Sequence, residues 1–402
     1  MSLADHTIWW HVFPLGALGA PIREREQGQE HDVVHRLPGL EAWLDYVVEL
    51  GCSGLLLGPV FESTSHGYDT LDYFRIDPRL GDDADFEHLV AEARGRGLSL
   101  MLDGVFNHVG AQHPLVTGNS ALVRRDATGA ALGWEGHAGL VTLDHDNPAV
   151  ADLVAEVMLH WLRRGIAGWR LDAAYSVPST FWATVLPRVR QEFPDALFLG
   201  EVLHGDYAAI AAAGTLDSVT QYELWKAIWS SIKDRNFWEL AWALERHQEF
   251  SDQVLMQTFV GNHDVSRIAS TVGDAGAVLA LVVLMTLPGM PSVYYGDEQA
   301  FRGEKGEGWA ADDQMRAPLP ATPDDLAGLG QWMLRLHQEL IGLRRRHPWL
   351  TRGRVEVIDK TNEQISYRTT GEGQDIVVEL GLDPRPSATI TADGTRLFEW
   401  SA

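Results

Sequence analysis

Four short segments of the chain each place a carboxylate directly after an apolar run. They are Asp103-Gly-Val-Phe-Asn-His108, Gly168-Trp-Arg-Leu-Asp172, Phe198-Leu-Gly-Glu201 and Phe259-Val-Gly-Asn-His-Asp264. Carboxylates that gather in one place, with an arginine and histidines beside them, are typical of an acid/base site. The chemistry available to such a set is proton transfer combined with attack by a carboxylate.

The spacing of these residues indicates how they could meet. Asp172 precedes Glu201 by 29 residues, about one strand–helix unit, and Glu201 precedes Asp264 by 63 residues, about two units. In a (β/α)₈ barrel, polar residues at the carboxyl ends of the strands converge on one catalytic mouth. We therefore expect an α/β chain folded as a (β/α)₈ TIM barrel.

The elements that would position these residues can be read from short apolar runs. The predicted barrel strands are 8–13, 54–58, 98–102, 166–171, 197–200, 218–221, 254–260 and 292–295. The helical patterns between them are 40–50, 84–96, 147–164, 179–193, 238–250 and 274–287. Strands that alternate with helices predict a parallel sheet, and eight units favour closure into a barrel.

Two regions depart from this alternation. Asp103 and Asp172 are 69 residues apart, too far for one unit, so we expect a short inserted module at 109–146 that shapes the cleft. After His347, short strands alternate with Gly, Asp and Pro turns. We expect a barrel domain over 1–347, which contains the insertion, and a small antiparallel β domain over 348–402.

Asp172 and Glu201 would lie at the ends of adjacent strands. Two carboxyl groups roughly 5 to 5.5 Å apart are the arrangement of a retaining glycosidase, with one as nucleophile and the other as acid. Arg170 points to the same face as Asp172, where its fixed charge would keep Asp172 ionised and oriented. The apolar residues before Glu201 would keep that side chain protonated.

Taken together, the four segments resemble the four sequence regions of the α-amylase superfamily of glycoside hydrolases. Further stretches at 51–60, 66–70, 140–148 and 289–297 also resemble segments of that superfamily, so the likeness runs from about residue 8 to 316. The resemblance implies a TIM barrel, a short domain B at 109–146 after the third strand, and a C-terminal antiparallel β domain.

The resemblance also implies residue roles. Asp172 would be the nucleophile, Glu201 the acid/base and Asp264 the transition-state stabiliser of a double-displacement mechanism acting on α-glucosidic bonds of maltooligosaccharide-like α-glucans. The side chains expected to bind or orient the substrate are Tyr68, Asp69, His108, Arg170, His263 and Tyr175. Asp69 would anchor the Tyr68 loop or Arg170, and Tyr175 would take the acceptor-side place of a Lys-His pair that many α-amylases carry.

Several alternatives stay open at this stage. His108 and His263 could be core histidines with satisfied hydrogen bonds, and Tyr68 could simply pack. The same glucosyl-enzyme could serve a transglucosylase or isomerase, because water exclusion decides between them. A non-catalytic sugar-binding or scaffold member of the fold is a further alternative.

No cofactor is required by this chemistry. The superfamily often holds a structural calcium, which would map to Asn107 and Asp144. The competing interpretation is that these two residues hydrogen-bond the backbone across the hinge of domain B.

Composition limits the remaining classes. With 32 basic and 56 acidic residues the formal net charge is −24, which argues against a nucleic-acid partner. Cys52 is the only cysteine, and no secretory signal or lipid-facing span is recognisable, so we expect a cytoplasmic protein that does not bind a membrane. The expected partner is an oligosaccharide or α-glucan substrate, and the sequence leaves open whether the chain forms a homo-oligomer.

The chain contains 15 tryptophans. Five of them fall on expected strands or helices and are predicted to be core: Trp9, Trp43, Trp161, Trp182 and Trp242. The four expected near the mouth are Trp134, Trp169, Trp225 and Trp309.

Overall fold

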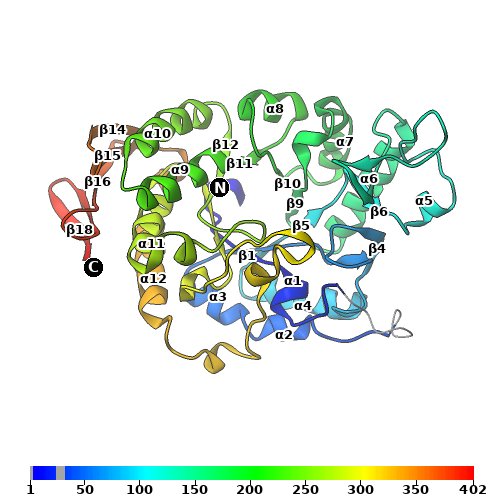
Figure 1. Ribbon diagram of the computed structural model, residues 1–402, viewed down its shortest axis with the longest axis horizontal. Coiled ribbons are helices and arrows are strands. Elements are labelled where there is room, and N and C mark those ends of the chain that lie inside the picture. The colour runs from blue at the N-terminus through cyan, green and yellow to red at the C-terminus, as the bar shows by residue number, and fades with distance from the viewer. Residues whose placement is uncertain (1–2, 24–31) are drawn as a thin grey trace.

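Eight parallel strands close into a barrel at the centre of the molecule (Figure 1). The structure is a computed structural model that describes residues 3–23 and 32–402, apart from the side chain of residue 309. The barrel strands are β1 (Trp9–Val12), β2 (Gly54–Leu57), β5 (Ser99–Gly104), β9 (Gly168–Leu171), β10 (Leu197–Gly200), β11 (Ser218–Thr220), β12 (Leu255–Phe259) and β13 (Met290–Tyr294). Each overlaps one of the predicted runs, so the predicted barrel is confirmed.

Helices cover the outside of the barrel. They are α1 (Pro14–Ala17), α2 (Pro38–Glu41), α3 (Leu44–Leu50), α4 (Asp83–Gly95), α6 (Pro148–Arg163), α7 (Ser179–Glu192), α8 (Tyr207–Gly214), α9 (Tyr222–Lys233), α10 (Trp238–Ser251), α11 (Ile268–Thr286) and α12 (Gln331–Arg346). The sequence analysis did not predict α8 and α9. The signal for α9 was present, because Leu224, Ala227, Ile228 and Ile232 are buried at helical spacing.

The longest of these helices is a core helix. By length and composition α11 could cross a membrane, but 67% of its apolar window is buried inside the protein. It packs against α9 and α12, and it is interrupted at Gly273, where φ is 73°. The helix predicted at 274–287 and the strand predicted at 292–295 are observed as α11 and β13.

The interior of the barrel is filled at its amino-terminal end. A small apolar cluster there contains Ala4, Trp9, Leu56, Met101, Leu197, Leu199, Leu255 and Met290. A second and larger core lies between the strands and the helices. Because the lower layer is solid, polar side chains at the carboxyl ends of the strands stand on a rigid floor.

The inserted module is a small antiparallel sheet. It comprises β6 (His108–Gly110), α5 (Pro114–Thr117), β7 (Gly133–Trp134) and β8 (His137–Thr142), with the strand order β6-β8-β7. His108 pairs with Thr142, so the module is tied to the segment that leaves β5. A separate two-stranded sheet, β3 (Phe61–Ser63) and β4 (Thr70–Ile76), encloses the loop that carries Tyr68.

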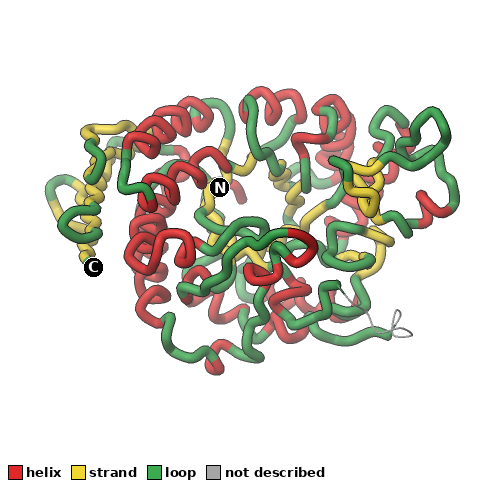
Figure 2. The backbone as a smooth tube through the Cα atoms, viewed as in Figure 1, coloured by secondary structure: helices red, strands yellow, loops and turns green. Residues whose placement is uncertain are grey.

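The chain ends in an antiparallel sheet on the opposite side of the molecule from the inserted module (Figure 1). Its strands are β14 (Arg354–Lys360), β15 (Gln364–Gly371), β16 (Gln374–Gly381), β17 (Ser387–Ala392) and β18 (Thr395–Ser401). Figure 2 shows helices between this sheet and the barrel strands. Tyr367 and Thr286 join the sheet to α11, with 2.7 Å between their hydroxyl oxygens. The predicted antiparallel β domain is therefore observed, and the predicted boundary after His347 falls just past α12.

One buried acid gives the fold a dependence on pH. Glu298 is fully buried, and its carboxylate accepts hydrogen bonds from the Tyr46 hydroxyl (3.0 Å) and the Gly296 backbone N–H (2.9 Å). Burial raises the pKa of Glu298 to about 7. Because the folded state then binds a proton more tightly than the unfolded chain does, this group makes the fold less stable as pH rises from about 4.5 to about 7.

We predict that Glu298→Gln removes this part of the pH dependence. In the wild type, ionisation of the Glu298 carboxyl lowers the free energy of unfolding by about 3 kcal/mol between pH 4.5 and pH values above 7. Urea unfolding of both proteins between pH 5 and 8 measures the difference. The free energy of unfolding of the variant should increase relative to that of the wild type as pH rises towards about 7. A difference that stays constant across this range would contradict the prediction.

Candidate active site

The carboxyl ends of the barrel strands bring the predicted carboxylates together. Asp103 is the second-last residue of β5, Asp172 directly follows β9, Glu201 directly follows β10, and Asp264 lies beyond the end of β12. Backbone bonds extend the barrel ladder past the strand ends: the Asp172 N–H donates to Gly104 (3.1 Å) and the Glu201 N–H donates to Leu171 (2.9 Å). The backbone at both carboxylates is therefore fixed by the barrel itself.

Arg170 is the cation at the centre of the site. Its side chain is almost fully buried, and its Nη1 lies 2.7 and 2.6 Å from the two carboxylate oxygens of Asp103. Nη2 lies 2.6 Å from Glu201 Oε1, whereas the nearest oxygen of Asp172 is 3.3 Å from Nη1. The guanidinium therefore neutralises Asp103 and Glu201 more closely than Asp172, which differs from the expectation.

The electrostatics of Asp172 differ from the expectation that Arg170 keeps this carboxyl ionised. Burial raises the pKa of Asp172 well above its ordinary value, the Glu201 charge raises it further, and Arg170 only partly opposes both. Burial and the Glu201 charge therefore favour the protonated form of Asp172 in the ligand-free site, whereas Arg170 favours its ionised form. The surroundings of Glu201 include Arg170 of the adjacent strand as well as the apolar residues that precede Glu201 in the sequence.

Glu201 has two further hydrogen-bond donors. Its Oε2 accepts from the Ala173 N–H (3.0 Å), and its Oε1 accepts from the Tyr222 hydroxyl (3.2 Å). The side-chain amide of Asn262 donates in turn to that hydroxyl (2.8 Å). The sequence analysis did not single out Tyr222, although it directly follows a predicted strand, the position at which the other site residues were found.

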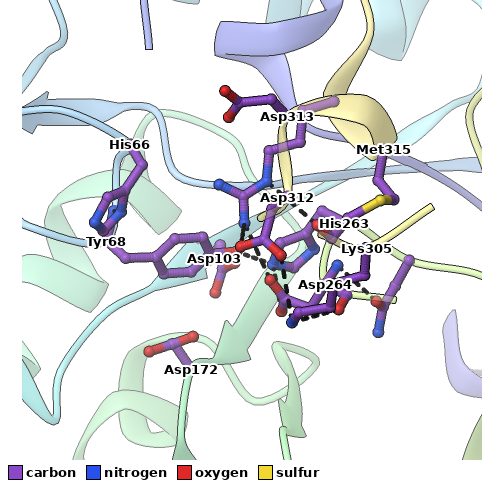
Figure 3. A network of polar contacts seen from close by, with 12 residues as sticks. His66, Tyr68, Asp103, Asp172, His263, Asp264, Lys305, Asp312, Asp313 and Met315 are labelled. Atoms are coloured by element: carbon purple, nitrogen blue, oxygen red, sulfur yellow. Dashed lines mark hydrogen bonds and ion pairs between the residues drawn. The ribbon is translucent and has the colours of Figure 1, made fainter. Parts of the chain in front are cut away.

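Asp264 is the carboxylate on the other side of the cleft. Its Oδ2 lies 3.0 Å from His263 Nε2 and its Oδ1 lies 3.1 Å from Arg316 Nη2. Lys305 donates to the Asp264 backbone carbonyl, so both the side chain and the backbone of Asp264 are held in place (Figure 3). Burial alone would raise the pKa of Asp264, but the charges of His263, Arg316 and Arg170 bring it well below its ordinary value. Asp264 is therefore ionised across the physiological range.

The sequence analysis did not identify Arg316 as a site residue. It is the last residue of a short 3₁₀ turn, Asp313–Arg316, between β13 and α12, and its guanidinium lies over the Phe13 ring. It bonds Asp264, the His263 carbonyl (3.2 Å) and Asp312 (3.2 Å). No local pattern marks this arginine, because its partners come from elsewhere in the chain.

We predict that Arg316→Gln moves the acid limb of the kcat/KM profile to higher pH. Loss of the cation beside Asp264 raises the pKa of that carboxyl, so ionised Asp264 is lost at a higher pH than in the wild type. We expect kcat/KM at neutral pH to fall about 10- to 100-fold. A pH profile between 4 and 8 measures both effects, and a uniform loss without a shifted limb would contradict the electrostatic role.

Tyr68 and His263 lie against each other. Their rings stack with centroids 5.3 Å apart, and the Tyr68 hydroxyl contacts both His263 Nε2 and Asp103 Oδ2. Tyr68 also lines the cleft, whereas His263 is fully buried behind Asp264. In this arrangement Nε2 of His263 contacts both the Asp264 carboxylate and the Tyr68 hydroxyl, so His263 orients these two side chains.

His108 and Asp69 support the same loop. His108 Nε2 donates to the Tyr68 backbone carbonyl (3.1 Å), and the His108 ring stacks on Trp134 of the inserted module at 4.8 Å. Burial lowers the pKa of His108 to about 4, so the ring is neutral at physiological pH. Asp69 accepts from the Ser65 N–H (3.1 Å) and the Ser65 hydroxyl (2.6 Å), which holds the loop that carries Tyr68.

These side chains line a cleft of about 870 Å³. Its floor contains Tyr68, His108, Asp172, Glu201 and Asp264. One wall comes from the inserted module and the segment after β9, with Trp134, Glu135, His137, Leu140 and Tyr175, and the other comes from α9 and α10, with Tyr222, Glu223, Trp225, Lys226, Glu239 and Trp242. Tyr175 lines the cleft, and its hydroxyl donates to Glu135 (3.4 Å); an acceptor-side role for Tyr175 stays a prediction.

Two tryptophans were placed wrongly by the sequence analysis. Trp169 is fully buried among Phe61 and Phe106, outside the mouth, because alternate strand residues of a barrel face its helices. Trp242 is 54% exposed and lines the cleft, although its position on a helix suggested core.

The predicted calcium ligands do not form a donor set that fits the ion. The Asn107 side-chain amide donates to His108 Nδ1 (3.0 Å), and the Asp144 carboxylate lies 3.6 Å from the Arg124 guanidinium. Calcium requires six to eight oxygen ligands, and a cation beside the carboxylate opposes its binding. A backbone hydrogen bond crosses the hinge of the inserted module, because the Leu143 N–H donates to the Asn107 carbonyl (3.1 Å).

Comparison with known proteins places this site in a family. The family model for the catalytic domain of α-amylases matches residues 26–125 and 133–351. Neopullulanase 2 of Thermoactinomyces vulgaris is 32% identical over 381 residues, which cover 88% of this chain and 62% of that protein. The intracellular maltogenic amylase of Bacillus subtilis is 30% identical over 407 residues, covering 90% and 66% respectively. The chain thus spans less than two thirds of the length of each of these relatives.

A solved structure supports the fold. The cyclic α-maltosyl-(1→6)-maltose hydrolase of Arthrobacter globiformis, in its ligand-free form, superposes with a TM-score of 0.82 at 24% identity. The match covers 100% of this chain and 99% of that one. With the matched family model and the two relatives, the barrel and its mouth lead to one conclusion: this chain belongs to the α-amylase family.

Proposed function

We propose that the chain is a retaining glycoside hydrolase that cleaves α-glucosidic bonds in maltooligosaccharide-like α-glucans. The observation that carries the proposal is the placement of Asp172 and Glu201 around one buried guanidinium, with ionised Asp264 on the other side of the same cleft. The names of the relatives, a neopullulanase and a maltogenic amylase, support α-glucans as the substrate class.

In the proposed first step, Asp172 attacks the anomeric carbon while Glu201 gives a proton to the departing glycosidic oxygen. This step requires an ionised Asp172 and a protonated Glu201 when the sugar is bound. The bound sugar favours this arrangement, because the glycosidic oxygen provides a hydrogen-bond acceptor beside Glu201. Asp172 is then the ionised member of the pair and can act as the nucleophile.

In the proposed second step, Glu201 takes a proton from water, which attacks the glucosyl–Asp172 ester and releases a sugar of retained configuration. Asp264 would bind the ring hydroxyls more tightly as positive charge develops on the sugar. These steps use side chains and water only, so the mechanism requires no organic cofactor. A cytoplasmic location is part of the proposal and is supported by the relative named as intracellular.

Proton NMR of the products tests the proposal. The wild type would be incubated with maltose to maltoheptaose, pullulan, cyclodextrins, isomaltose, sucrose and trehalose, and the first anomer released would be recorded. Initial α-anomer from a glucan supports retaining hydrolysis. Longer or rearranged products would instead indicate glucosyl transfer or isomerisation, β-anomer would exclude retention, and silence from every substrate would favour a non-catalytic protein.

A further inference from the structure

The wall of the cleft formed by α9 and α10 carries two tryptophans from different helices. Trp225 lies on α9 and Trp242 on α10, and both line the cleft. The side chain of Trp242 is 54% exposed. This exposure is unusual, because contact of the large apolar indole with water is unfavourable. A large exposed aromatic in a concave site marks a contact surface more often than a packing defect.

Trp242 is held in place by both helices. The guanidinium of Arg246, one turn further along α10, lies 5.0 Å from the centre of the Trp242 ring. Arg246 is fixed in turn by Glu223 of α9, with Nε 2.5 Å from Oε1 and Nη2 3.1 Å from Oε2. An ion pair between Lys226 and Glu239 ties the same helices and also lines the cleft. The ring is therefore oriented before any ligand arrives.

Trp225 connects this wall to the reacting carboxylates. Its ring meets the Tyr222 ring edge to face at 5.9 Å, and the Tyr222 hydroxyl donates to Glu201. Glu201 is the group that would protonate the departing oxygen. The wall that begins at Tyr222 therefore extends along the side occupied by the leaving sugar.

The chemistry of the wall suits a neutral, hydroxyl-bearing ring. The C–H face of a glucosyl unit is apolar and stacks on indole, while its edge hydroxyls can bond charged side chains such as Lys226 and Glu239. We propose that Trp242, with Trp225, forms a binding subsite for glucosyl units of the leaving group and so sets a preference for longer substrates. This inference rests on the proposed function.

Trp238 provides a matched control. It lies one turn before Trp242 on the same helix and is 52% exposed, but it does not line the cleft. Its indole N–H donates instead to Asn362 (3.0 Å), and Lys360 lies over its ring. Trp242→Ala and Trp238→Ala thus remove equally exposed indoles from one helix, and only the first removes the proposed subsite.

The experiment compares kcat/KM for maltotriose and maltoheptaose in the two variants. We expect Trp242→Ala to lose about tenfold in kcat/KM for maltoheptaose, mainly through KM, with a smaller loss for maltotriose. Trp238→Ala should match the wild type on both. If the two variants behave alike, or if Trp242→Ala loses equally on both substrates, the proposal is overturned.

A binding measurement separates this proposal from the proposed function. Maltoheptaose would be titrated into Asp172→Asn and into Asp172→Asn/Trp242→Ala by calorimetry. Weaker binding in the double variant supports the subsite even if the wild type cleaves no glucan, in which case only the hydrolytic function fails. Equal binding overturns the subsite even if hydrolysis is observed, and absence of binding to both proteins overturns both proposals.

Discussion

Asp172→Asn should abolish cleavage while leaving the fold at least as stable as the wild type. We expect kcat to fall by about 10⁴-fold or more, because an amide cannot form the glucosyl ester of the proposed mechanism. The expected gain or neutrality in stability has a separate cause. Burial and the neighbouring Glu201 charge raise the pKa of Asp172, so the fold tolerates a neutral side chain there better than a carboxylate.

Product release rates and urea unfolding at pH 7 measure the two effects on the same protein. Asp152→Asn, the same chemical change at an exposed position on α6, is the control and should match the wild type in rate. A variant at position 172 that keeps more than a hundredth of the wild-type kcat would remove Asp172 from the nucleophile role. A loss of stability of more than about 1 kcal/mol would contradict the electrostatic account.

Arg170→Met should both inactivate the protein and destabilise its fold. The guanidinium is the closest counter-ion of two buried carboxylates, Asp103 and Glu201, which would be left as uncompensated charges. Breaking a buried ion pair by removing one partner costs about 3–5 kcal/mol. The deficit should shrink when unfolding is measured at pH 5 instead of pH 7, because protonation of the carboxylates then relieves the uncompensated charge.

The double variant Arg170→Met/Asp103→Asn distinguishes this account from a simple packing loss. Removing one of the two buried carboxylates should restore part of the stability, and activity should stay absent because Glu201 is still without its cation. Urea unfolding and the product assay supply both readouts. If the single variant is as stable as the wild type, or if the second change adds to the damage, charge compensation by Arg170 is not what holds these strand ends.

Much of the site could be predicted from the sequence because a barrel converts local patterns into positions. The apolar run before Asp172 or Glu201 is a strand, and the residue after the run must lie at the mouth whatever the rest of the chain does. For this reason the predicted strands and the gathered carboxylates agree with the structure. The inserted module was found from spacing alone, since one interval was too long for a single unit.

Other features depend on residues that are distant in sequence. The guanidinium of Arg170 on one strand reaches Glu201 at the end of the next strand, a contact that no sequence neighbour reveals. Arg316 meets Asp264 only because the loop after β13 folds back over the mouth. Electrostatic energies depend on distance and burial, and both are set by tertiary packing.

The sequence by itself therefore determined the barrel, the family and the carboxylates at the mouth, since these follow from hydrophobic period and from position along each strand. Tertiary structure alone decided which carboxylates lie closest to Arg170 and which aromatic side chains face the cleft. Trp242 illustrates the second point: its helix was predicted, but a helix has both a buried and an open face. Only the packing of α9 beside α10 determines which face remains open to a substrate.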